Sequence, residues 1–366
     1  MAKCKLGDIC EIVSGSTPKT NIDEYWDGDI KWITPAELDD DTYIITDSVR
    51  KITELGVRKT GLSPIPEGTV ILSSRAPIGK VAIAGCEMYC NQGFKNLICS
   101  NKISNKYLYW FLKGKKALLN ALGRGATFKE ISKSIVSEIE INVPDLVCQN
   151  EVVKTLEKVN SIISLRKQEL HVLDDLIKAR FVEMFGDVKY GIERWGGKPF
   201  KDIAINLDSK RKPVKDADRK KMQGIYPYYG ATGIVDYVND YRQDGEFLLI
   251  SEDGKALELR SKPIAFLASG KIWVNNHAHV QQCTDECNII YLMYHINFMD
   301  VSIWVTGIDQ KKLNRANLDT IPIALPPIEL QKQFADFVKQ VDKSKVKVQK
   351  SLDETQCLFD SLMQKY

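Results

Sequence analysis

The feature that most constrains this 366-residue chain is a long helical pattern that occurs twice. The first copy covers residues 144–187, and the second copy covers residues 326–366 at the end of the chain. Pro144 and Pro326, which open the two copies, lie 182 positions apart, and the same offset holds without gaps upstream of the helices. Because an internal repeat changes the interpretation of a whole fold, we expect two units of one design.

Apolar residues in both copies recur at steps of three and four. This spacing is the a/d pattern of a coiled coil, and it continues for about five heptads. Polar residues interrupt the seam at Arg166, Arg180, Lys345 and Thr355. The apolar positions are Val152, Leu156, Val159, Ile163, Leu170, Leu173, Ile177 and Met184 in the first copy, and Phe334, Val338, Val341, Val348, Leu352, Phe359, Leu362 and Tyr366 in the second.

The narrow seam favours pairing of the two copies, which we call stems, with each other. A helix that lies along one domain usually buries a broader apolar face than an a/d seam provides. At about 1.5 Å per residue, a stem of about 40 residues would be a rod of ~60 Å. The alternative, in which each stem is an amphipathic helix lying on one domain, stays open at this point.

Composition describes an ordinary globular protein of two or three domains. Hydrophobic residues make up 44% of the chain and charged residues 27%, and the net charge is +3. No apolar run reaches the ~18 residues of a membrane span, and the first residues lack an apolar signal region. Nine cysteines without a signal region favour reduced thiols, so we expect a cytoplasmic protein.

The stems divide the rest of the chain into two heads, residues 1–143 and 188–325. Short apolar runs bounded by glycines predict strands, and two segments from residue 107 to residue 122 predict helices. The expected fold class is therefore α/β, with mixed α+β heads and two long helices that form an antiparallel coiled coil. Strands are expected at Trp32-Ile33, Val70 to Leu72, Val81 to Ala84, Phe247 to Ile250, Ile264 to Leu267 and Ile272 to Val274.

The order of head, stem, head, stem resembles the specificity subunit of type I DNA restriction-modification systems. The resemblance covers essentially the full length. It rests on the two stems together with short head motifs, none of which is decisive by itself. These motifs are Gly15-Ser-Thr-Pro-Lys19, Ser74-Arg-Ala-Pro-Ile-Gly79, Asn91-Gln-Gly93 and, at the end of the first stem, Phe181-Val-Glu-Met-Phe-Gly-Asp187.

The resemblance implies two target-recognition domains, each of which reads one half of a bipartite DNA site. It implies that the stems hold the halves apart and dock two methylation subunits, which bind S-adenosylmethionine and methylate adenine. A motor-nuclease subunit would join through the methylation complex. Independently, a ~60 Å rod exceeds the ~34 Å of one DNA turn, so two heads could skip the bases between two short sites. Antiparallel stems would relate the heads by a pseudo-two-fold axis, and heads of different sequence predict unlike half-sites.

DNA contacts in the first head are expected from basic and amide side chains near loops. Phosphates are bound by Lys and Arg, whereas bases are read by Arg, Lys, Asn or Gln at a groove edge. Loops on a rigid scaffold commonly carry such residues. The candidates are Lys19, Arg58, Lys59, Arg75, Lys80, Asn91, Gln92 and Lys95.

The second head contains a basic run from Lys198 to Lys221, with nine Lys or Arg against four Asp. An aromatic, glycine-rich segment, Tyr226 to Gly233, follows it and is interpreted as a loop that approaches a groove. For each residue separately, a solvated surface charge or a packed tyrosine is the alternative interpretation. The candidates here are Lys210, Arg211, Lys212, Tyr228, Tyr229, Lys271, Asn276 and His277.

Other chemistry is less well supported by the sequence. His277 and His279 could ligate zinc, but the spacing of Cys283 and Cys287 suits a zinc site poorly, so hydrogen bonding is the preferred role. The chain contains no phosphate-binding GxxxxGK[ST] loop, and we find no dinucleotide fingerprint and no adenine-methyltransferase motif. We therefore predict a non-catalytic chain without metal or cofactor of its own.

Two functions from other classes remain open. One is a standalone enzyme that acts on DNA, and the other is a coiled-coil scaffold whose heads bind protein. If the chain is a specificity subunit, the outer faces of the stems are candidates for docking the methylation subunits. Solvated helix surface is the equally plausible alternative for the residues concerned, which are Lys154, Glu157, Lys158 and Lys178.

Overall fold

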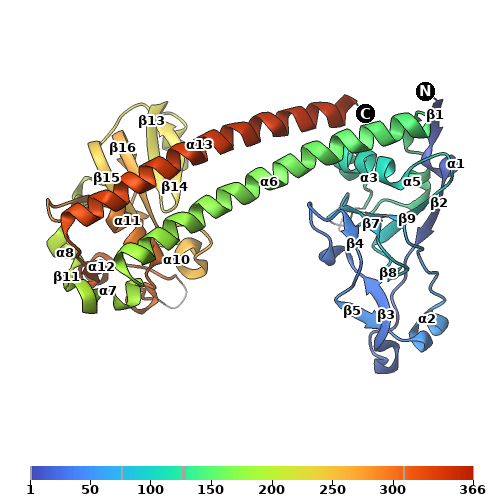
Figure 1. Cartoon of the computed structure of the whole chain (residues 1–366), viewed down its shortest axis with the longest axis horizontal. Helices are drawn as coiled ribbons and strands as arrows, with labels where there is room; N and C mark the ends of the chain where they lie inside the picture. Colours follow the sequence, from blue (N-terminus) through green and yellow to red (C-terminus); the bar gives the residue numbers. More distant parts are fainter. Residues whose placement is uncertain (1, 76, 126–128, 308–309, 366) are drawn as a thin grey trace. The chain divides into compact units, whose positions relative to one another are not determined.

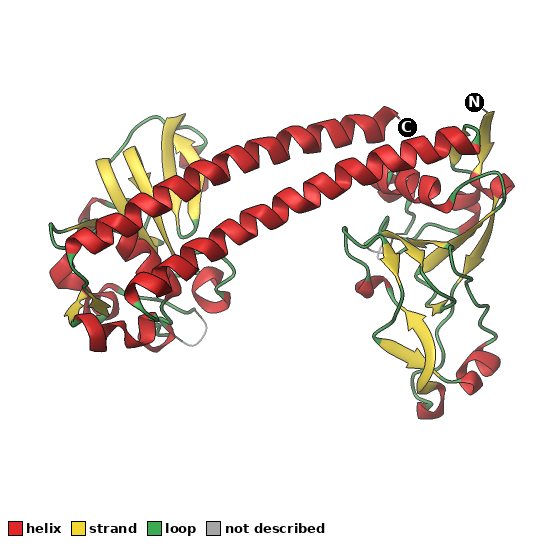
Figure 2. Ribbon diagram, in the orientation of Figure 1, coloured by secondary structure: helices red, strands yellow, loops and turns green. Residues whose placement is uncertain are grey.

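Two compact units make up the computed structural model of the chain, which describes residues 2–75, 77–125, 129–307 and 310–365. The first unit comprises residues 1–167 and 350–366, and the second comprises residues 168–349. The two longest helices, α6 (Leu146–Phe185) and α13 (Ile328–Lys365), each contribute one half to each unit (Figure 1). Every head is a mixture of strands and short helices (Figure 2).

The long helices pack through the repeated apolar seam. In the first unit, Val152 and Leu156 of α6 share a buried core with Phe359 of α13. In the second unit, Phe181 of α6 shares a core with Phe334 of α13. The start of α6 thus meets the end of α13, and the end of α6 meets the start of α13, which confirms the predicted antiparallel pairing. Tyr366, assigned to the seam from the sequence, lies outside the described residues.

A polar exception in the seam is partnered within the second unit. The ammonium group of Lys345 lies 2.5 Å from Asp174 Oδ1 on α6 and 3.8 Å from Asp342 on its own helix. Its side chain is only 26% exposed. A partly buried charge that needs a partner on the facing helix penalises other alignments, so this pair helps to fix the register of the two helices.

The first head contains a five-stranded sheet in the order β2-β9-β6-β7-β4 and a three-stranded sheet in the order β5-β3-β8. A further pair, β1 with β10, closes the head where the first stem begins. The strands are β1 (Ala2–Lys5), β2 (Cys10–Ser14), β3 (Trp26–Ile33), β4 (Ile44–Ile45), β5 (Arg50–Ile52), β6 (Val70–Ser73), β7 (Val81–Ala84), β8 (Tyr89–Cys90), β9 (Phe94–Cys99) and β10 (Glu140–Val143). The helices are α1 (Leu6–Ile9), α2 (Glu54–Thr60), α3 (Asn105–Gly114), α4 (Lys116–Leu122) and α5 (Lys133–Ser137).

The second head contains a six-stranded sheet in the order β12-β17-β15-β16-β13-β14, and β11 pairs with β18. The strands are β11 (Gly197–Pro199), β12 (Ala204–Asn206), β13 (Gln223–Gly230), β14 (Gly233–Val238), β15 (Gln243–Ser251), β16 (Ala265–Val274), β17 (Ala278–Cys283) and β18 (Pro322–Ala324). The helices are α7 (Val188–Trp195), α8 (Phe200–Ile203), α9 (Asp216–Arg219), α10 (Lys255–Leu259), α11 (Ile289–Phe298) and α12 (Arg315–Thr320).

One sequence expectation for the second head was wrong, and two strands that were expected separately form a single strand. Tyr226 to Gly233, interpreted as a loop, is mostly strand β13, because its tyrosines are good strand formers and only its last residues turn. The runs at Ile264 to Leu267 and Ile272 to Val274 belong together, since strand β16 extends continuously from Ala265 to Val274. Gly270, within that strand, has a φ of 76° and lies opposite Gly245 in the partner strand.

A buried glutamine fixes each stem to its own head. Gln149 of α6 accepts a hydrogen bond from the Ser104 N–H at the start of α3, at 2.7 Å. Gln331 of α13 accepts one from the Asn288 N–H at the start of α11, at 2.8 Å. Both glutamines are fully buried. Each also donates a hydrogen bond to a backbone carbonyl group of its head, Gln149 to that of Lys102 and Gln331 to that of Glu286. The repeat therefore extends from the sequence to individual hydrogen bonds.

Candidate nucleic-acid interface

Four loops of the first head are tied together at one end of its sheets. The Ser74 N–H donates to the Gly93 carbonyl at 2.7 Å, and the Ile131 N–H donates to the Ser74 carbonyl at 2.9 Å. The Ser16 N–H donates to the Cys90 carbonyl at 3.0 Å. These bonds join loops that the sequence separates widely. We call residues 15–19, 74–77, 91–93 and 129–131 the first loop cluster, of which Ala76 lies outside the described residues.

The second head repeats the same connections with other residues. The Glu252 N–H donates to the His277 carbonyl at 2.9 Å, and the Leu313 N–H donates to the Glu252 carbonyl at 2.8 Å. The Lys212 N–H donates to the Val274 carbonyl at 3.1 Å. Residues 208–215, 252–255, 275–277 and 311–313 form the second loop cluster. One backbone arrangement thus carries two different sets of side chains.

A buried cation supports the first loop cluster. The Lys95 side chain is 7% exposed, and its ammonium group lies 3.3 Å from Glu130 Oε1 and 3.4 Å from Ser74 Oγ. Glu130 also accepts a hydrogen bond from Arg75 Nε at 2.9 Å. Partial burial alone would raise the pKa of Glu130, but Arg75 and Lys95 together lower it below its ordinary value. The carboxylate therefore holds two loops together through two cations.

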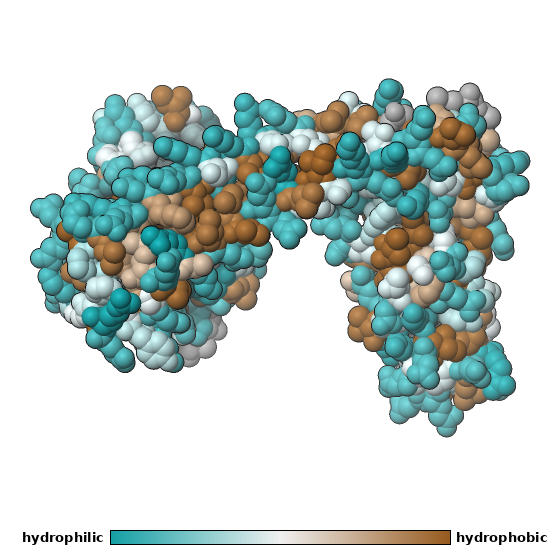
Figure 3. All heavy atoms as spheres, in the orientation of Figure 1, coloured by the Kyte–Doolittle hydropathy of each residue, from teal (hydrophilic) through white to brown (hydrophobic). Residues whose placement is uncertain are grey.

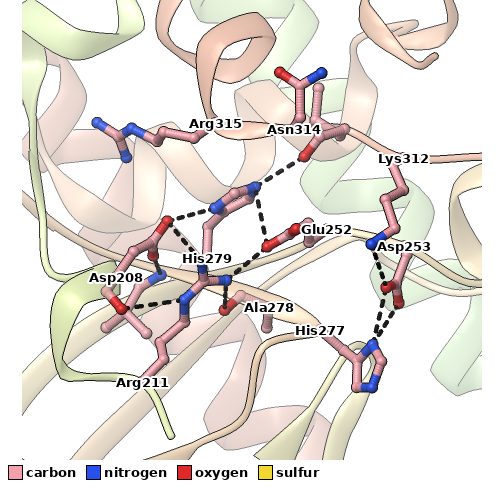
Figure 4. A network of polar contacts seen from close by, with 12 residues as sticks. Asp208, Arg211, Glu252, Asp253, His277, Ala278, His279, Lys312, Asn314 and Arg315 are labelled. Carbon is pink, nitrogen blue, oxygen red and sulfur yellow. Dashed lines mark hydrogen bonds and ion pairs between the residues drawn. The ribbon is translucent and has the colours of Figure 1, made fainter. Parts of the chain in front are cut away.

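His279 occupies the corresponding position in the second loop cluster (Figure 4). Its ring is 1% exposed, with Nδ1 2.6 Å from Asp208 Oδ2 and Nε2 2.8 Å from the Leu313 carbonyl. Both ring nitrogens therefore lie within hydrogen-bonding distance of oxygen atoms. The same buried place holds a nitrogen-bearing side chain beside a carboxylate in both heads, although the residue type differs.

Arg211 completes this buried network. Its guanidinium group lies 3.3 Å from Asp208 and 2.7 Å from Glu252, and it also donates to the Ala278 carbonyl at 3.0 Å. Burial alone would raise the pKa of Asp208, but hydrogen bonds from His279 and the Val280 N–H, with the charge of Arg211, lower it. Arg211 and His279 thus share the carboxylates of Asp208 and Glu252 beside the second loop cluster.

The ion pair at the rim of each cluster has opposite polarity in the two heads. In the first head, the loop at residues 74–77 carries the cation, Arg75, and the loop at residues 129–131 carries the carboxylate, Glu130. In the second head, the loop at residues 252–255 carries Asp253. The Asp253 carboxylate lies 3.8 Å from Lys312, which belongs to the loop at residues 311–313. Asp253 also contacts His277 Nδ1 at 2.9 Å. The two loop clusters therefore carry opposite charges at equivalent positions, of which Arg75 is exposed and Asp253 is buried.

The candidate residues inferred from the sequence fall into three groups by exposure. Lys19, Arg58, Lys59, Arg75, Gln92, Lys210, Lys212, Lys271 and Asn276 are exposed. Lys80, Asn91, Arg211 and His277 are partly buried. Lys95, Tyr228 and Tyr229 are buried.

Several of these side chains support the structure from within. The Lys80 ammonium group donates to the carbonyls of Pro35 and Leu38. The Tyr228 hydroxyl accepts a hydrogen bond from the Val214 N–H at 2.9 Å, and its ring is 1% exposed. Such residues hold loops in place, whereas the exposed members are accessible to a ligand.

Three exposed candidates lie outside the loop clusters. Arg58 and Lys59 are in the last turn of helix α2. Lys271 lies within strand β16, which ends at Val274, just before the second loop cluster. Its ammonium group lies 4.7 Å from the ring centre of Tyr241. The structure thus brings together mainly the candidates from the motifs at residues 15–19 and 91–93 and from the middle of the basic run.

Sequence reasoning missed part of each cluster. Lys129 and Lys311 are exposed, lie in equivalent loops and are related by the 182-residue offset, so the repeat itself was a signal for them. Asp208 and Glu252 gave no signal, because an isolated carboxylate in a sequence does not reveal its buried partners. Among the residues that the structure describes, no group of three or more His, Cys, Asp or Glu could hold a metal ion.

The fold and the two loop clusters define a class of proteins with two globular heads. In this class, a head followed by a long helix occurs twice, and the two long helices pair with each other. A family model for the type I restriction modification DNA specificity domain matches residues 1–174 and 192–355. The chain belongs to this family of type I restriction-modification specificity subunits. Within the described part of the chain, no helix is long and apolar enough to cross a membrane.

Individual relatives and solved structures agree with this assignment. The chain is 28% identical to the type I restriction enzyme MjaIX specificity subunit of Methanocaldococcus jannaschii, over 99% of this chain and 91% of the relative. It is 23% identical to the EcoprrI specificity subunit of Escherichia coli, over 92% of this chain and 86% of the relative. The fold is similar to the crystal structure of the S subunit from M. genitalium, with a TM-score of 0.59 and 16% identity over 100% of this chain and 95% of the other.

Proposed function

We propose that this chain is the DNA sequence-recognition subunit of a type I restriction-modification complex. Residues 1–143 and 188–325 are the two target-recognition domains, and each reads one half of a bipartite DNA site. Residues 144–187 and 326–366 are the stems that set the spacing of the two halves and dock the methylation subunits.

The single observation that carries this proposal is the repeated loop cluster with unlike side chains. The same backbone hydrogen bonds recur in both heads, while the rim ion pair changes from Arg75–Glu130 to Lys312–Asp253. A protein that must read two different short sequences needs one stable frame and two different surfaces. Exposed lysines in both clusters are suited to phosphates, and exposed amides are suited to base edges.

The exposed faces of the stems support docking of partner helices. Ile162 and Leu165 in the first unit are 37% and 59% exposed, and Val172 and Leu176 in the second are 54% and 45% exposed. Figure 3 shows hydrophobic side chains among hydrophilic ones along the long helices. Exposed apolar side chains at helical spacing are typical of a surface that another helix covers. A solved structure of similar fold, with a TM-score of 0.57 and 14% identity, comes from work on complex assembly of the type I R-M system.

The charged docking candidates separate into two kinds. Lys154, Lys158 and Lys178 are exposed and available to a partner. Glu157 instead accepts hydrogen bonds from the Tyr43 hydroxyl at 2.6 Å and from Lys106 at 2.9 Å, which ties the stem to the first head. Two methylation subunits would use the exposed stem faces and bind S-adenosylmethionine themselves. Restriction subunits would join through that complex, which works on DNA in the cytoplasm, and this chain would perform no catalytic step.

The test is co-expression with a matching methylation subunit, followed by sequencing of the methylated adenines in the host DNA. The expected result is a bipartite motif with two unlike halves and a fixed spacer. Replacing residues 188–325 with the corresponding head of a relative should change one half and leave the other half and the spacer unchanged. The purified chain alone, supplied with S-adenosylmethionine and DNA, should transfer no methyl groups. An assembled complex that neither binds nor methylates DNA would favour a protein-binding scaffold.

Removing exposed lysines from the second loop cluster should weaken the salt dependence of DNA binding. We expect the triple replacement of Lys210, Lys212 and Lys215 by alanine to lower the slope of log K against log salt by about 2 to 3, since each phosphate contact contributes about 0.9. Arg211 is left in place because it belongs to the buried network. Binding of the complex with methylation subunits to duplex DNA is measured at several salt concentrations.

The matched control removes the same charge from the first head, away from its loop cluster. Lys3 and Lys5 in strand β1 and Lys102 beyond the Cys99 end of strand β9 are exposed, and their replacement by alanine should leave the slope unchanged. An equal slope for the wild-type chain and the variant of the second loop cluster would remove Lys210, Lys212 and Lys215 from the interface.

A further inference from the structure

A short asparagine turn occurs at the same position in both loop clusters. The Asn91 N–H donates to the Ile33 carbonyl at 3.0 Å, and the Asn91 side chain accepts from the Gly93 N–H at 2.9 Å. In the second head, the Asn275 N–H donates to the Tyr229 carbonyl at 3.1 Å. The Asn275 side chain accepts from the His277 N–H at 2.8 Å, which closes the same turn.

The strands that position the two turns are also equivalent. Asn91 follows β8, which pairs in parallel with β3 through Trp32 and Tyr89. Asn275 follows β16, which pairs in parallel with β13 through Tyr228 and Trp273. Because a parallel pair ends at one edge of the sheet, each turn projects from that edge beside the loop that follows its neighbouring strand.

The middle residue of each turn carries an exposed amide. Gln92 and Asn276 are exposed, whereas Gly93 in the first turn and Asn275 in the second are buried. Each turn is therefore held by its flanking residues and presents its central side chain to solvent. In the first head, the Thr17 hydroxyl donates to Gln92 Oε1, which orients the amide and leaves its Nε2 group available.

Positive charge lies beside each amide in the same loop cluster. The loop that contains Ser16 and exposed Lys19 is bonded to the Cys90 carbonyl, one residue before the first turn. The loop that contains exposed Lys212 is bonded to the Val274 carbonyl, one residue before the second turn. Lysines that contact phosphates position a protein on the duplex, and a neighbouring amide can then reach a base edge.

We propose that Gln92 and Asn276 are the equivalent base-reading side chains of the two heads, each of which recognises an adenine in its own half-site. An amide can accept from the adenine N6 amino group and donate to N7 at once, a pattern that no other base presents in the major groove. This inference rests on the proposed function. Because the charges beside each amide differ, a shared adenine contact is compatible with half-sites that differ at neighbouring positions.

The test uses the complex with methylation subunits and the motif that the wild-type chain methylates. Gln92→Ala should relax one adenine position in one half-site, and Asn276→Ala should relax one adenine position in the other half. Affinity for duplex DNA that carries 7-deazaadenine at that position should fall about 5- to 150-fold for the wild-type complex. The corresponding alanine variant should show no such fall, because its contact to N7 is already lost.

An altered-specificity variant separates base reading from a merely structural role. A carboxylate can accept from the cytosine N4 amino group but cannot donate to N7, so Gln92→Glu should shift the preferred base at that position from adenine to cytosine. Control variants are Asn101→Ala and Asn239→Ala, which also remove exposed amides. Asn101 follows the Cys99 end of strand β9 and Asn239 follows the Val238 end of strand β14, and in each strand this is the end that faces away from the loop cluster. Both controls should methylate the wild-type motif.

The possible outcomes distinguish this inference from the function on which it rests. A wild-type complex that methylates a bipartite motif, together with alanine variants that keep every position of that motif, would overturn the inference alone. A wild-type complex that assembles but recognises no DNA motif would overturn the proposed function and the inference with it. Relaxation of a single position in one half-site per variant is the result that supports both.

Discussion

Replacement of Phe181 by alanine should lower the free energy of unfolding of the second unit by about 3–5 kcal/mol. The Phe181 ring is 1% exposed and lies at the end of α6, where the first stem enters the second unit. Its centroid is 5.4 Å from that of Phe334 on α13 and 5.7 Å from that of Tyr291 on α11. Truncation removes edge and stacking contacts from three helices at once and leaves a cavity that rigid neighbours cannot fill.

Urea unfolding followed by circular dichroism measures this loss. The matched control is Val182→Ala, one residue further along the same helix, where the side chain is 46% exposed and the expected loss is below about 0.5 kcal/mol. A loss below about 1 kcal/mol for Phe181→Ala would mean that the stem end does not belong to the core of the second unit. The head would then fold independently of α6.

The long helices were predictable because their signal is redundant. Each apolar position of the seam is one of eight in its stem, all at the same spacing, so a polar interruption such as Lys345 does not hide the pattern. Short strands have no such redundancy. The glycines near Tyr229 and at Gly270 interrupt the apolar runs of the sequence. A strand can nevertheless contain a glycine where its backbone bends. Both segments are strands because they pair with neighbouring strands of the sheet.

The loop clusters were predictable only in part, for a different physical reason. The sequence shows where charges occur but not which of them have buried partners. Lys210, Arg211 and Lys212 form one basic run, yet the structure places Arg211 between two carboxylates and leaves both lysines exposed. The equivalence of Lys95 and His279 was hidden as well, because the shared property is burial beside a carboxylate and not a residue type.

Loss of Asp208 should cost about 3–5 kcal/mol of the free energy of unfolding of the second unit, because it removes a buried partner of Arg211, His279 and the Val280 N–H. Its carboxylate contacts His279 at 2.6 Å and accepts the Val280 N–H at 2.8 Å. In Asp208→Ala, the Arg211 guanidinium group and the His279 ring face Glu252 alone. The lowered pKa of Asp208 means that its contribution is complete above the unfolded carboxyl pKa of about 3.9 and is lost as the pH falls below that value.

Removing the imidazole together with the carboxylate separates the loss of a buried partner from lost packing. In Asp208→Ala combined with His279→Met, the remaining Arg211 and Glu252 form a balanced pair at 2.7 Å, so the double variant should be more stable than Asp208→Ala alone. Asp216→Ala is the surface control, since that carboxylate is 82% exposed and its ion pair with Arg219 contributes at most about 1 kcal/mol. Urea unfolding at pH 7 measures these variants, His279→Met alone and the wild-type chain. Strictly additive losses in the double variant would show that Asp208 and His279 act independently, and the second loop cluster would then be held by its backbone hydrogen bonds alone.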